Sequence, residues 1–347
     1  MSNRVYLDWN ATAPLRPEAR AAMLEAMDLV GNPSSVHTEG RAAKALVEKA
    51  RGQVARLVGC DPEEVVFTSG ATEAAMIALK DMSCAGSAVE HDCVAVWVNT
   101  EVVKVDASGL MEPMGGAATK QVANSETGVI QRHDDALVFE DAVQAVGKIA
   151  YAFRSSPAAS AAVSAHKLGG PKGVGALLIR DNHATEMRVL GGGHEKGRRS
   201  GTENVIGVAG FGAAAEAAQR DLQEGAWNGV ERLRDTLEER LAEAAPELIV
   251  FGRDAPRLPN TSCFAAPGWR GETQVIQMDL AGFAVSAGSA CSSGKVKASR
   301  VLMAMGFDEE TAGSAIRVSF GPTTTEAEVM AFAEAWIAAY RRRADRL

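Results

Sequence analysis

Residues 164–175 read SAHKLGGPKGVG, and the rest of the chain is organised around this stretch. A lysine, Lys167, follows small and polar residues, and four glycines and a proline come close behind it. A tight loop of this kind suits an amine that another molecule approaches along the backbone. Lys167 is therefore our candidate for a Schiff-base lysine, which holds a carbonyl compound and passes it to a second amine. A surface turn with solvated lysines is the alternative that this stretch leaves open.

Length and composition indicate a globular enzyme. The chain has 347 residues, 46% of them hydrophobic and 23% charged, which fits about two domains. No stretch of the sequence approaches the roughly 20 uninterrupted apolar residues of a membrane span, and no signal or transit segment is visible at the N-terminus. We therefore expect a cytoplasmic protein that binds no membrane. The net charge of −8 argues against direct nucleic-acid binding.

The number and spacing of the cysteines argue against a set of disulfide bonds and against a zinc site. The number of cysteines is odd, and they are scattered without the spacing of a zinc site. A chemical role for one of them stays open. The cysteines are Cys60, Cys84, Cys93, Cys263 and Cys291.

Helices and strands alternate along the first two thirds of the chain. Apolar spacing predicts helices over 16–30, 41–58, 204–219 and 227–245. Apolar or β-rich runs predict strands over 65–68, 94–98, 102–105, 136–141 and 175–180. This alternation predicts an α/β fold whose sheet is mostly parallel and covered on both faces.

Two strand ends carry polar groups. The strand at 65–68 opens a helix near Ser69, Ala71 and Thr72, and the free N–H groups of a helix start form a ready phosphate site. A plain N-cap at Ser69 is the commoner alternative. The strand at 136–141 ends on Asp141, at the edge of a parallel sheet where ligands bind.

The pattern of predicted helices and strands changes after residue 246. Short strands are expected at 248–251, 261–264, 285–286 and 316–320, which indicates a smaller α+β domain. A capping box, Thr325 with Glu328, starts the last helix. We assign residues 16–246 to a large domain, and residues 1–15 and 247–347 to a small one.

These pieces together meet the requirements of pyridoxal 5'-phosphate. Lys167 provides an amine for the aldehyde, Asp141 an acid for the pyridinium nitrogen, and the helix start a phosphate site. An aspartate keeps the ring nitrogen protonated, which lets the ring accept electrons when a substrate bond breaks.

Along nearly its whole length the chain resembles the cysteine desulfurases of the class-V aminotransferase family. That resemblance implies the fold of pyridoxal-phosphate-dependent transferases, fold type I, with a large sheet of the seven-stranded type. The motifs that carry it fall in the family's order: YLD at 6–8, ATAP at 11–14, GNPSS at 31–35, TSGATE at 68–73, Glu90-His91, Asp141 with Gln144, His166-Lys167, GGGHE at 191–195, RSGT at 199–202 and SAC at 289–291.

The resemblance implies a role for each matching position. His91 would stack on the cofactor ring and serve as a base, Asp141 would pair with the ring nitrogen, and Gln144 would contact the ring hydroxyl. The phosphate would be held by Ala71, Thr72, Ser164 and His166, and by Thr202 from the other subunit of a homodimer.

The substrate and the sulfur are assigned in the same way. Cys291 would be the thiolate that attacks the substrate sulfur and carries the persulfide. Arg317 would clamp the carboxylate of L-cysteine, a task that suits its planar fork, and Asn124 would also face the substrate. The product would be L-alanine, and the sulfur would pass to an unidentified protein acceptor for iron–sulfur cluster assembly or thiolation.

Some features depart from the family pattern, and other functions stay open. Ser125 stands where relatives usually have a second asparagine that meets cofactor and substrate. The stretch at 92–123 is shorter than usual, and the chain stops soon after its last helix. The alternatives are a selenocysteine lyase, a class-V aminotransferase, or a non-catalytic partner of a sulfur carrier. The joint presence of Lys167, Asp141, His91 and Cys291 favours the desulfurase.

Overall fold

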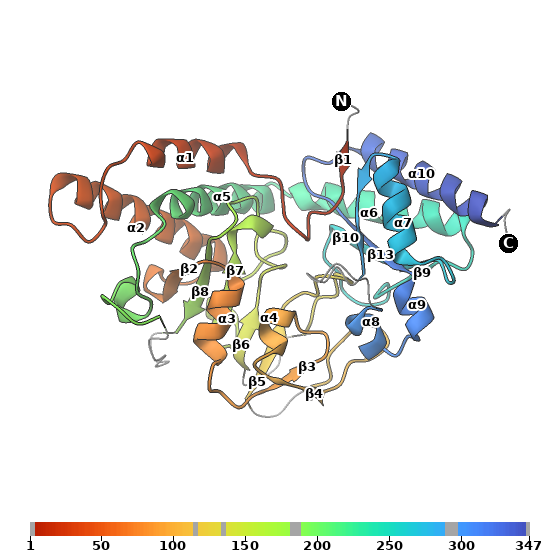
Figure 1. Ribbon diagram of the computed structural model, residues 1–347, viewed down its shortest axis with the longest axis horizontal. Coiled ribbons are helices and arrows are strands. Elements are labelled where there is room, and N and C mark those ends of the chain that lie inside the picture. The colour runs from red at the N-terminus through yellow and green to blue at the C-terminus, as the bar shows by residue number, and fades with distance from the viewer. Residues whose placement is uncertain (1–3, 114–116, 133–136, 181–188, 289–297, 345–347) are drawn as a thin grey trace.

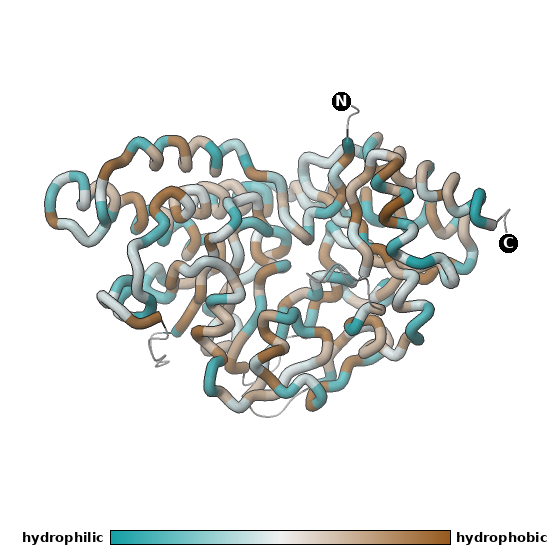
Figure 2. The backbone as a smooth tube through the Cα atoms, viewed as in Figure 1, coloured by the Kyte–Doolittle hydropathy of each residue, from teal (hydrophilic) through white to brown (hydrophobic). Residues whose placement is uncertain are grey.

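The computed structural model describes residues 4–113, 117–132, 137–180, 189–288 and 298–344. They form a larger lobe with a central sheet and a smaller lobe that contains both the first strand and the last helix (Figure 1). The two ends of the chain thus lie on the same lobe. Apolar residues lie mainly along the inner segments of both lobes (Figure 2).

The large sheet has seven strands among the described residues, in the order β2-β8-β7-β6-β5-β3-β4. All neighbouring pairs are parallel except those of β8, which is antiparallel to β2 and β7. The expected mostly parallel sheet of seven strands is thereby confirmed. Its strands are β2 (Val65–Thr68), β3 (Ala85–Ser87), β4 (Asn99–Val103), β5 (Ala118–Gln121), β6 (Leu137–Asp141), β7 (Ser160–Ser164) and β8 (Gly175–Ile179).

Both faces of this sheet are buried. In β8, Ala176 and Leu178 belong to one apolar cluster, and Leu177 and Ile179 belong to another on the opposite face. This alternation follows from the two-residue period of a strand. Helices α1 (Pro17–Met27), α2 (Thr38–Val58) and α5 (Val205–Gln223) cover the first face, and α3 (Ala71–Leu79) covers the second (Figure 1).

One predicted strand of the large domain is wrong. Residues 94–98 were expected to be extended, but α4 (Asp92–Ala95) ends within them and a turn follows it. The side chain of His91 accepts a hydrogen bond from the Cys93 N–H, at 3.2 Å, and so caps the helix. A local side-chain cap therefore overrides the strand propensity of the valines.

The small domain is built around a second sheet, in the order β12-β13-β10-β9, and the predicted short strands are confirmed. These are β9 (Ile249–Val250), β10 (Thr261–Ala265), β12 (Ser286–Ala287) and β13 (Ala315–Ser319). The N-terminal β1 (Val5–Tyr6) pairs with β11 (Phe283–Ala284), so the first residues belong to this lobe. Helices α7 (Gly271–Leu280) and α10 (Glu326–Ala344) pack on its core, while α8 (Arg300–Ala304) and α9 (Glu309–Gly313) lie beside it. The predicted capping box joins Thr325 N–H to Glu328 at 2.8 Å.

Helix α6 (Ala226–Ala244) lies between the proposed domains. Its buried face, which includes Trp227, Leu237 and Leu241, belongs to the apolar cluster of the small domain. The packing therefore favours a domain boundary before α6 over one after residue 246. In the described residues, no helix is both long and apolar enough to cross a membrane.

Candidate active site

Lys167 lies in a 3-10 turn, Ala165–Lys167, directly after the central strand β7. Its Nζ donates hydrogen bonds to the backbone carbonyls of Asn10, at 2.5 Å, and Ala11, at 2.9 Å. Burial, together with the positive charge of Arg317, lowers the pKa of Lys167 to about 8. The amine is thus held by neutral acceptors and is far easier to deprotonate than an ordinary lysine.

Glycines bring the Lys167 turn against the start of α3. A Cβ atom on Gly175 would lie 2.6 Å from the Val163 carbonyl oxygen and 2.7 Å from the Gly70 Cα, so no larger residue fits. Gly70, by contrast, has nothing within 4 Å of its Cβ position. The N-terminus of α3 therefore sits beside β7 and faces open space.

Asp141 ends β6, as predicted, and is buried. Its Oδ1 accepts a hydrogen bond from the Val143 N–H at 3.0 Å. Burial raises the pKa of Asp141, and the charges of His91 and Lys167 oppose this shift. A cationic group that reached this carboxylate would therefore be stabilised strongly.

Asn10 joins the residues of the site across the two domains, and the sequence analysis did not find it. Its backbone oxygen accepts from both Lys167 and Gln144, the latter at 3.0 Å. Its side chain contacts Asn260 and Thr261 of the small domain. A lone asparagine two residues after Asp8 gave no signal in the sequence.

A second buried lysine, Lys148, was also missed. Its Nζ donates to Gln144 Oε1 at 2.6 Å and to Asn10 Oδ1 at 2.8 Å. Burial, with the charges of Lys167 and Arg317, lowers the pKa of Lys148 well below its ordinary value. The hydrogen bond from Lys148 thus orients the side-chain amide of Gln144, the residue assigned to the cofactor hydroxyl. A charged residue within the apolar run AVGKI was the only sequence signal.

His91 lies before α4 and is exposed. Its Nδ1 lies 3.2 Å from the Cys93 backbone nitrogen and 3.0 Å from the Cys93 Sγ. The preceding residue, Glu90, is buried, and burial with the nearby charge of Asp141 raises the pKa of its carboxyl to about 8.

The predicted phosphate residues gather near the start of α3 and the end of β7. Ala71 and Thr72 begin α3, and Ser164 is the buried last residue of β7. His166 Nδ1 lies 3.2 Å from Thr12 Oγ1, and burial lowers the pKa of His166 to about 4. Thr202 is exposed and lines a cavity of about 100 Å³ together with Ser69 and Gly173.

Arg317 lies on β13 and is buried against the site. Its Nη2 donates to Asp8 Oδ1 at 2.7 Å, and its Nη1 donates to the Ser125 carbonyl at 3.0 Å. Its buried Nε has no hydrogen-bond partner in the described part of the chain. The guanidinium therefore retains a donor for a ligand.

Asn124, predicted to face the substrate, is buried in its own loop. Its Oδ1 accepts from the N–H groups of Glu126 and Thr127, both at 2.9 Å, and its Nδ2 donates to the Val89 carbonyl. These bonds fix the turn whose Ser125 carbonyl meets Arg317. Cys291 lies outside the described residues.

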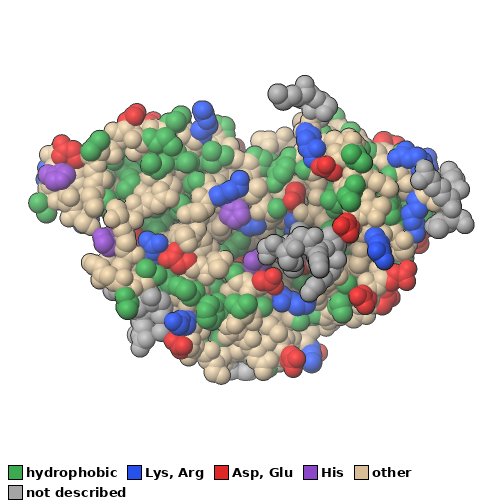
Figure 3. All heavy atoms as spheres, in the orientation of Figure 1, with side chains coloured by type: hydrophobic (Ala, Val, Ile, Leu, Met, Phe, Trp, Pro, Cys, Tyr) green, Lys and Arg blue, Asp and Glu red, His purple; other side chains and the backbone are tan. Residues whose placement is uncertain are grey.

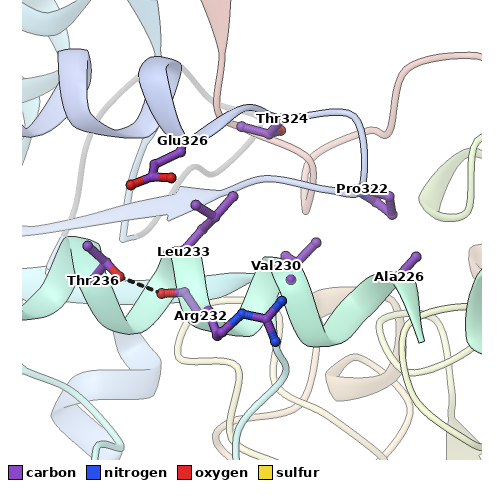
Figure 4. A pocket seen from close by; sticks show the side chains of 9 residues that line it. Ala226, Val230, Arg232, Leu233, Thr236, Pro322, Thr324 and Glu326 are labelled. Atoms are coloured by element: carbon purple, nitrogen blue, oxygen red, sulfur yellow. Dashed lines mark hydrogen bonds between the residues drawn. The ribbon is translucent and has the colours of Figure 1, made fainter.

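Basic and histidine side chains gather on the surface between the two lobes (Figure 3). A separate cavity of about 460 Å³ lies between α6 and the segment before α10, where Arg232 and Glu326 line opposite sides (Figure 4). None of the predicted site residues lines it. Among the described residues, no cluster of His, Cys, Asp or Glu could hold a metal ion.

The residues between the lobes fit pyridoxal 5'-phosphate. The amine of Lys167 donates to backbone carbonyls and not to a carboxylate. The buried carboxyl group of Asp141 would be stabilised in its charged form by a cation, and the start of α3 is open beside Gly70. Helix N-termini bind phosphate groups in this way.

Comparison with known proteins gives a consistent result. The class-V aminotransferase profile matches residues 5–103 and 119–332. A cysteine desulfurase of Cereibacter sphaeroides is 38% identical, over 94% of this chain and 93% of that protein. The structure of a NifS-like protein from Rickettsia africae has a TM-score of 0.87 and 30% identity, and the match covers 97% of this chain and 99% of that one. The structure of SspA in complex with cysteine has a TM-score of 0.75 and 25% identity, covering 92% of this chain and 100% of that one.

Proposed function

The chain is a cysteine desulfurase of the class-V aminotransferase family, and from this premise we propose which of its residues release sulfur from L-cysteine and leave L-alanine. The family depends on pyridoxal 5'-phosphate. When bound, this group supplies an aldehyde for the substrate amine and a ring that accepts electrons as the carbon–sulfur bond breaks.

Lys167 is the amine that holds the cofactor aldehyde. The observation that carries this assignment is the place of its amine, which follows β7 and donates hydrogen bonds to the backbone carbonyls of Asn10 and Ala11; burial there lowers its pKa to about 8. At pH 7 roughly a tenth of such an amine is neutral and nucleophilic, against far less than a hundredth for an ordinary lysine. The same amine can later accept and return protons next to the substrate.

Asp141 and Gln144 orient the cofactor ring. Asp141 is a buried carboxylate whose raised pKa favours pairing with a protonated ring nitrogen. Gln144 is fixed by Lys148 and Asn10, so its amide is pre-set for the ring hydroxyl. The phosphate is held at the N-terminus of α3 by Ala71 and Thr72, with Ser164 and His166 beside them.

Arg317 binds the carboxylate of L-cysteine. Its buried Nε is free of protein partners in the described residues, and its Nη2 is shared with Asp8. A substrate carboxylate would gain a charge-assisted hydrogen bond there, in competition with Asp8. Asn124 acts through the turn that presents the Ser125 carbonyl to Arg317.

Cys291 accepts the sulfur as a persulfide, which then passes to a protein acceptor. Three other thiols are unsuited to this, because burial raises the pKa of Cys60 to about 12 and also raises the pKa values of Cys84 and Cys263. Only a thiolate is a good nucleophile.

The active unit is a homodimer, to which Thr202 contributes across the interface. Thr202 is exposed, and so are several large apolar side chains of the large domain: Leu24, Met27, Val30, Val36 and Leu190. An apolar surface of this kind is typical of a protein interface.

The test is to incubate the purified yellow protein with L-cysteine and a reductant, and to measure alanine and sulfide together. We expect equal amounts of both, and mass spectrometry should find an extra sulfur on the peptide that contains Cys291. Cys291→Ser should keep the cofactor colour and form no alanine, whereas Cys60→Ser, Cys84→Ser and Cys263→Ser should stay active. Extra sulfur on another cysteine would contradict the assignment.

A further inference from the structure

The ring of His91 is held on one side by a single residue, Cys93. The Cys93 backbone N–H points at His91 Nδ1 from 3.2 Å, and the Cys93 Sγ lies 3.0 Å from the same nitrogen. The thiol is half-buried and packs against the apolar cluster between α3 and the large sheet. Both contacts therefore come from a side chain and a backbone that are fixed in place.

The backbone N–H decides which ring nitrogen carries the proton. An amide N–H can only donate, so the Nδ1 that it faces must be an acceptor. If Nδ1 carried a proton, two N–H groups would point at each other. A neutral His91 therefore has its proton on Nε2, and the lone pair of Nδ1 is shared by two donors, the amide and the thiol.

The thiol can donate only while it is protonated. Burial, and after it the negative charges of Asp141 and Glu90, raises the pKa of Cys93 well above that of an ordinary thiol. An imidazolium–thiolate pair is excluded for the same reason, and also because its Nδ1–H would face the amide N–H. Cys93 thus remains an S–H donor throughout the neutral range.

We infer that Cys93 is a positioning residue, which holds the neutral His91 ring in its Nε2–H form and directs an N–H donor to the side away from α4. The inference rests on the proposed place of His91 in the active site, beside Lys167 and Asp141. It gives the half-buried thiol a function that needs no nucleophilic chemistry, and it leaves sulfur transfer to Cys291.

The test is nitrogen NMR of the histidine side chains in the holoenzyme, labelled with ¹⁵N and assigned with His91→Gln. In the wild type at neutral pH, Nδ1 of His91 should show the shift of an unprotonated ring nitrogen, and Nε2 that of a protonated one. Cys93→Ala retains the amide N–H and loses only the thiol donor, so the preference for the Nε2–H form should weaken roughly fivefold, which corresponds to about 1 kcal/mol, and both signals should move from the wild-type values toward their tautomer average. Cys93→Ser retains a donor and should restore the wild-type shifts.

Cys84→Ala is the matched control, because Cys84 lies in the same apolar cluster and no hydrogen bond to His91 is found for it in the described residues. It should leave the His91 signals unchanged. A protonated Nδ1 in the wild type, or unchanged signals in Cys93→Ala, would overturn the inference. Because the signals are read without turnover, a failure of the proposed desulfurase activity would be seen separately.

Discussion

Two groups of buried charged side chains lie in this protein, and their charges are balanced in opposite ways. Arg51 and Glu195 form a pair whose side chains are only 4% and 1% exposed. Lys148 and Arg317 are also buried and Lys167 is partly buried, but the two lysines contact amide and carbonyl oxygens instead of carboxylates. The first arrangement keeps its charges, and the second makes its amines easy to deprotonate.

The Arg51–Glu195 pair is a structural unit. Two hydrogen bonds, of 2.7 and 3.0 Å, join the side chains, and Glu195 also accepts from the Phe67 N–H. Burial alone would lower the pKa of Arg51, but Glu195 raises it above its ordinary value. The pair anchors the glycine-rich segment that leads to Thr202, in which Glu195 and Lys196 have positive φ angles of 48° and 58°.

The difference teaches how to distinguish a structural charge from a reactive one. A buried charge whose hydrogen bonds and counter-ion are complete is chemically inert, and removal of its partner is strongly destabilising because the charge is then left buried and unpaired. A buried amine without a contacting carboxylate destabilises its own charged form, and this makes it a base and a nucleophile near neutral pH. The following experiments test this contrast.

The largest effect is expected from Lys167→Ala, because it removes the amine that burial makes reactive. The variant should form no measurable alanine. Borohydride should attach the cofactor covalently to the wild type but not to the variant, and peptide mass spectrometry would read this directly. The exposed Lys172 in the same loop is the control, and Lys172→Ala should behave as the wild type. An adduct found on Lys172 instead would refute the assignment.

Breaking the structural pair should affect stability instead of chemistry. Glu195→Gln leaves Arg51 charged and buried, so the free energy of unfolding should fall by about 3–5 kcal/mol, measured by urea denaturation. The control is Glu334→Gln, which removes an exposed pair with Arg240 and should cost about 1 kcal/mol or less. Equal losses in the two variants would mean that burial does not distinguish the pairs.

Stability should also depend on pH through Lys167. Its pKa is about 8 in the folded protein and about 10.4 in an unfolded chain, so between these values the unfolded chain binds more protons. The free energy of unfolding of the cofactor-free protein should therefore rise with pH from about 8 to 10, by up to about 3 kcal/mol. Lys167→Met should be the more stable protein at pH 7 and should lack this part of the rise. Parallel curves for the two proteins would show that Lys167 is not destabilised by burial.

The smallest effect is expected from Arg317→Lys. A lysine cannot reproduce the fork that contacts Asp8, Ser125 and the substrate, so binding of L-cysteine should weaken by about 1–3 kcal/mol. Steady-state kinetics would show this as a raised KM. Arg257→Lys is the control, because Arg257 is equally buried in a pair with Glu238. If both variants have the KM of the wild type, the carboxylate binds elsewhere.

Much of the fold was predictable because it follows from local patterns. Apolar or β-rich runs marked four of the seven described large-sheet strands, β2, β4, β6 and β8, and a strand that ended on an acid located Asp141 at the sheet edge. The strand predicted over residues 94–98 is wrong because their valines favour a strand, whereas the capping His91 starts a helix. For helix α6, an amphipathic pattern shows that one face is buried but not which core buries it, and only the structure shows that this face packs in the apolar cluster of the small domain.

The sequence by itself determined the chemistry of this protein: a lysine in a glycine-rich turn, an acid after a buried strand, and a helix start for phosphate, in an order that matches one family. Only the tertiary structure decided which groups surround them. Asn10 and Lys148 join the site, Asp8 pairs with Arg317, and Cys93 faces His91, because strand order and domain packing bring distant residues together. The lowered pKa of Lys167 is likewise tertiary, since burial and neighbouring charges set it and neither is local in sequence.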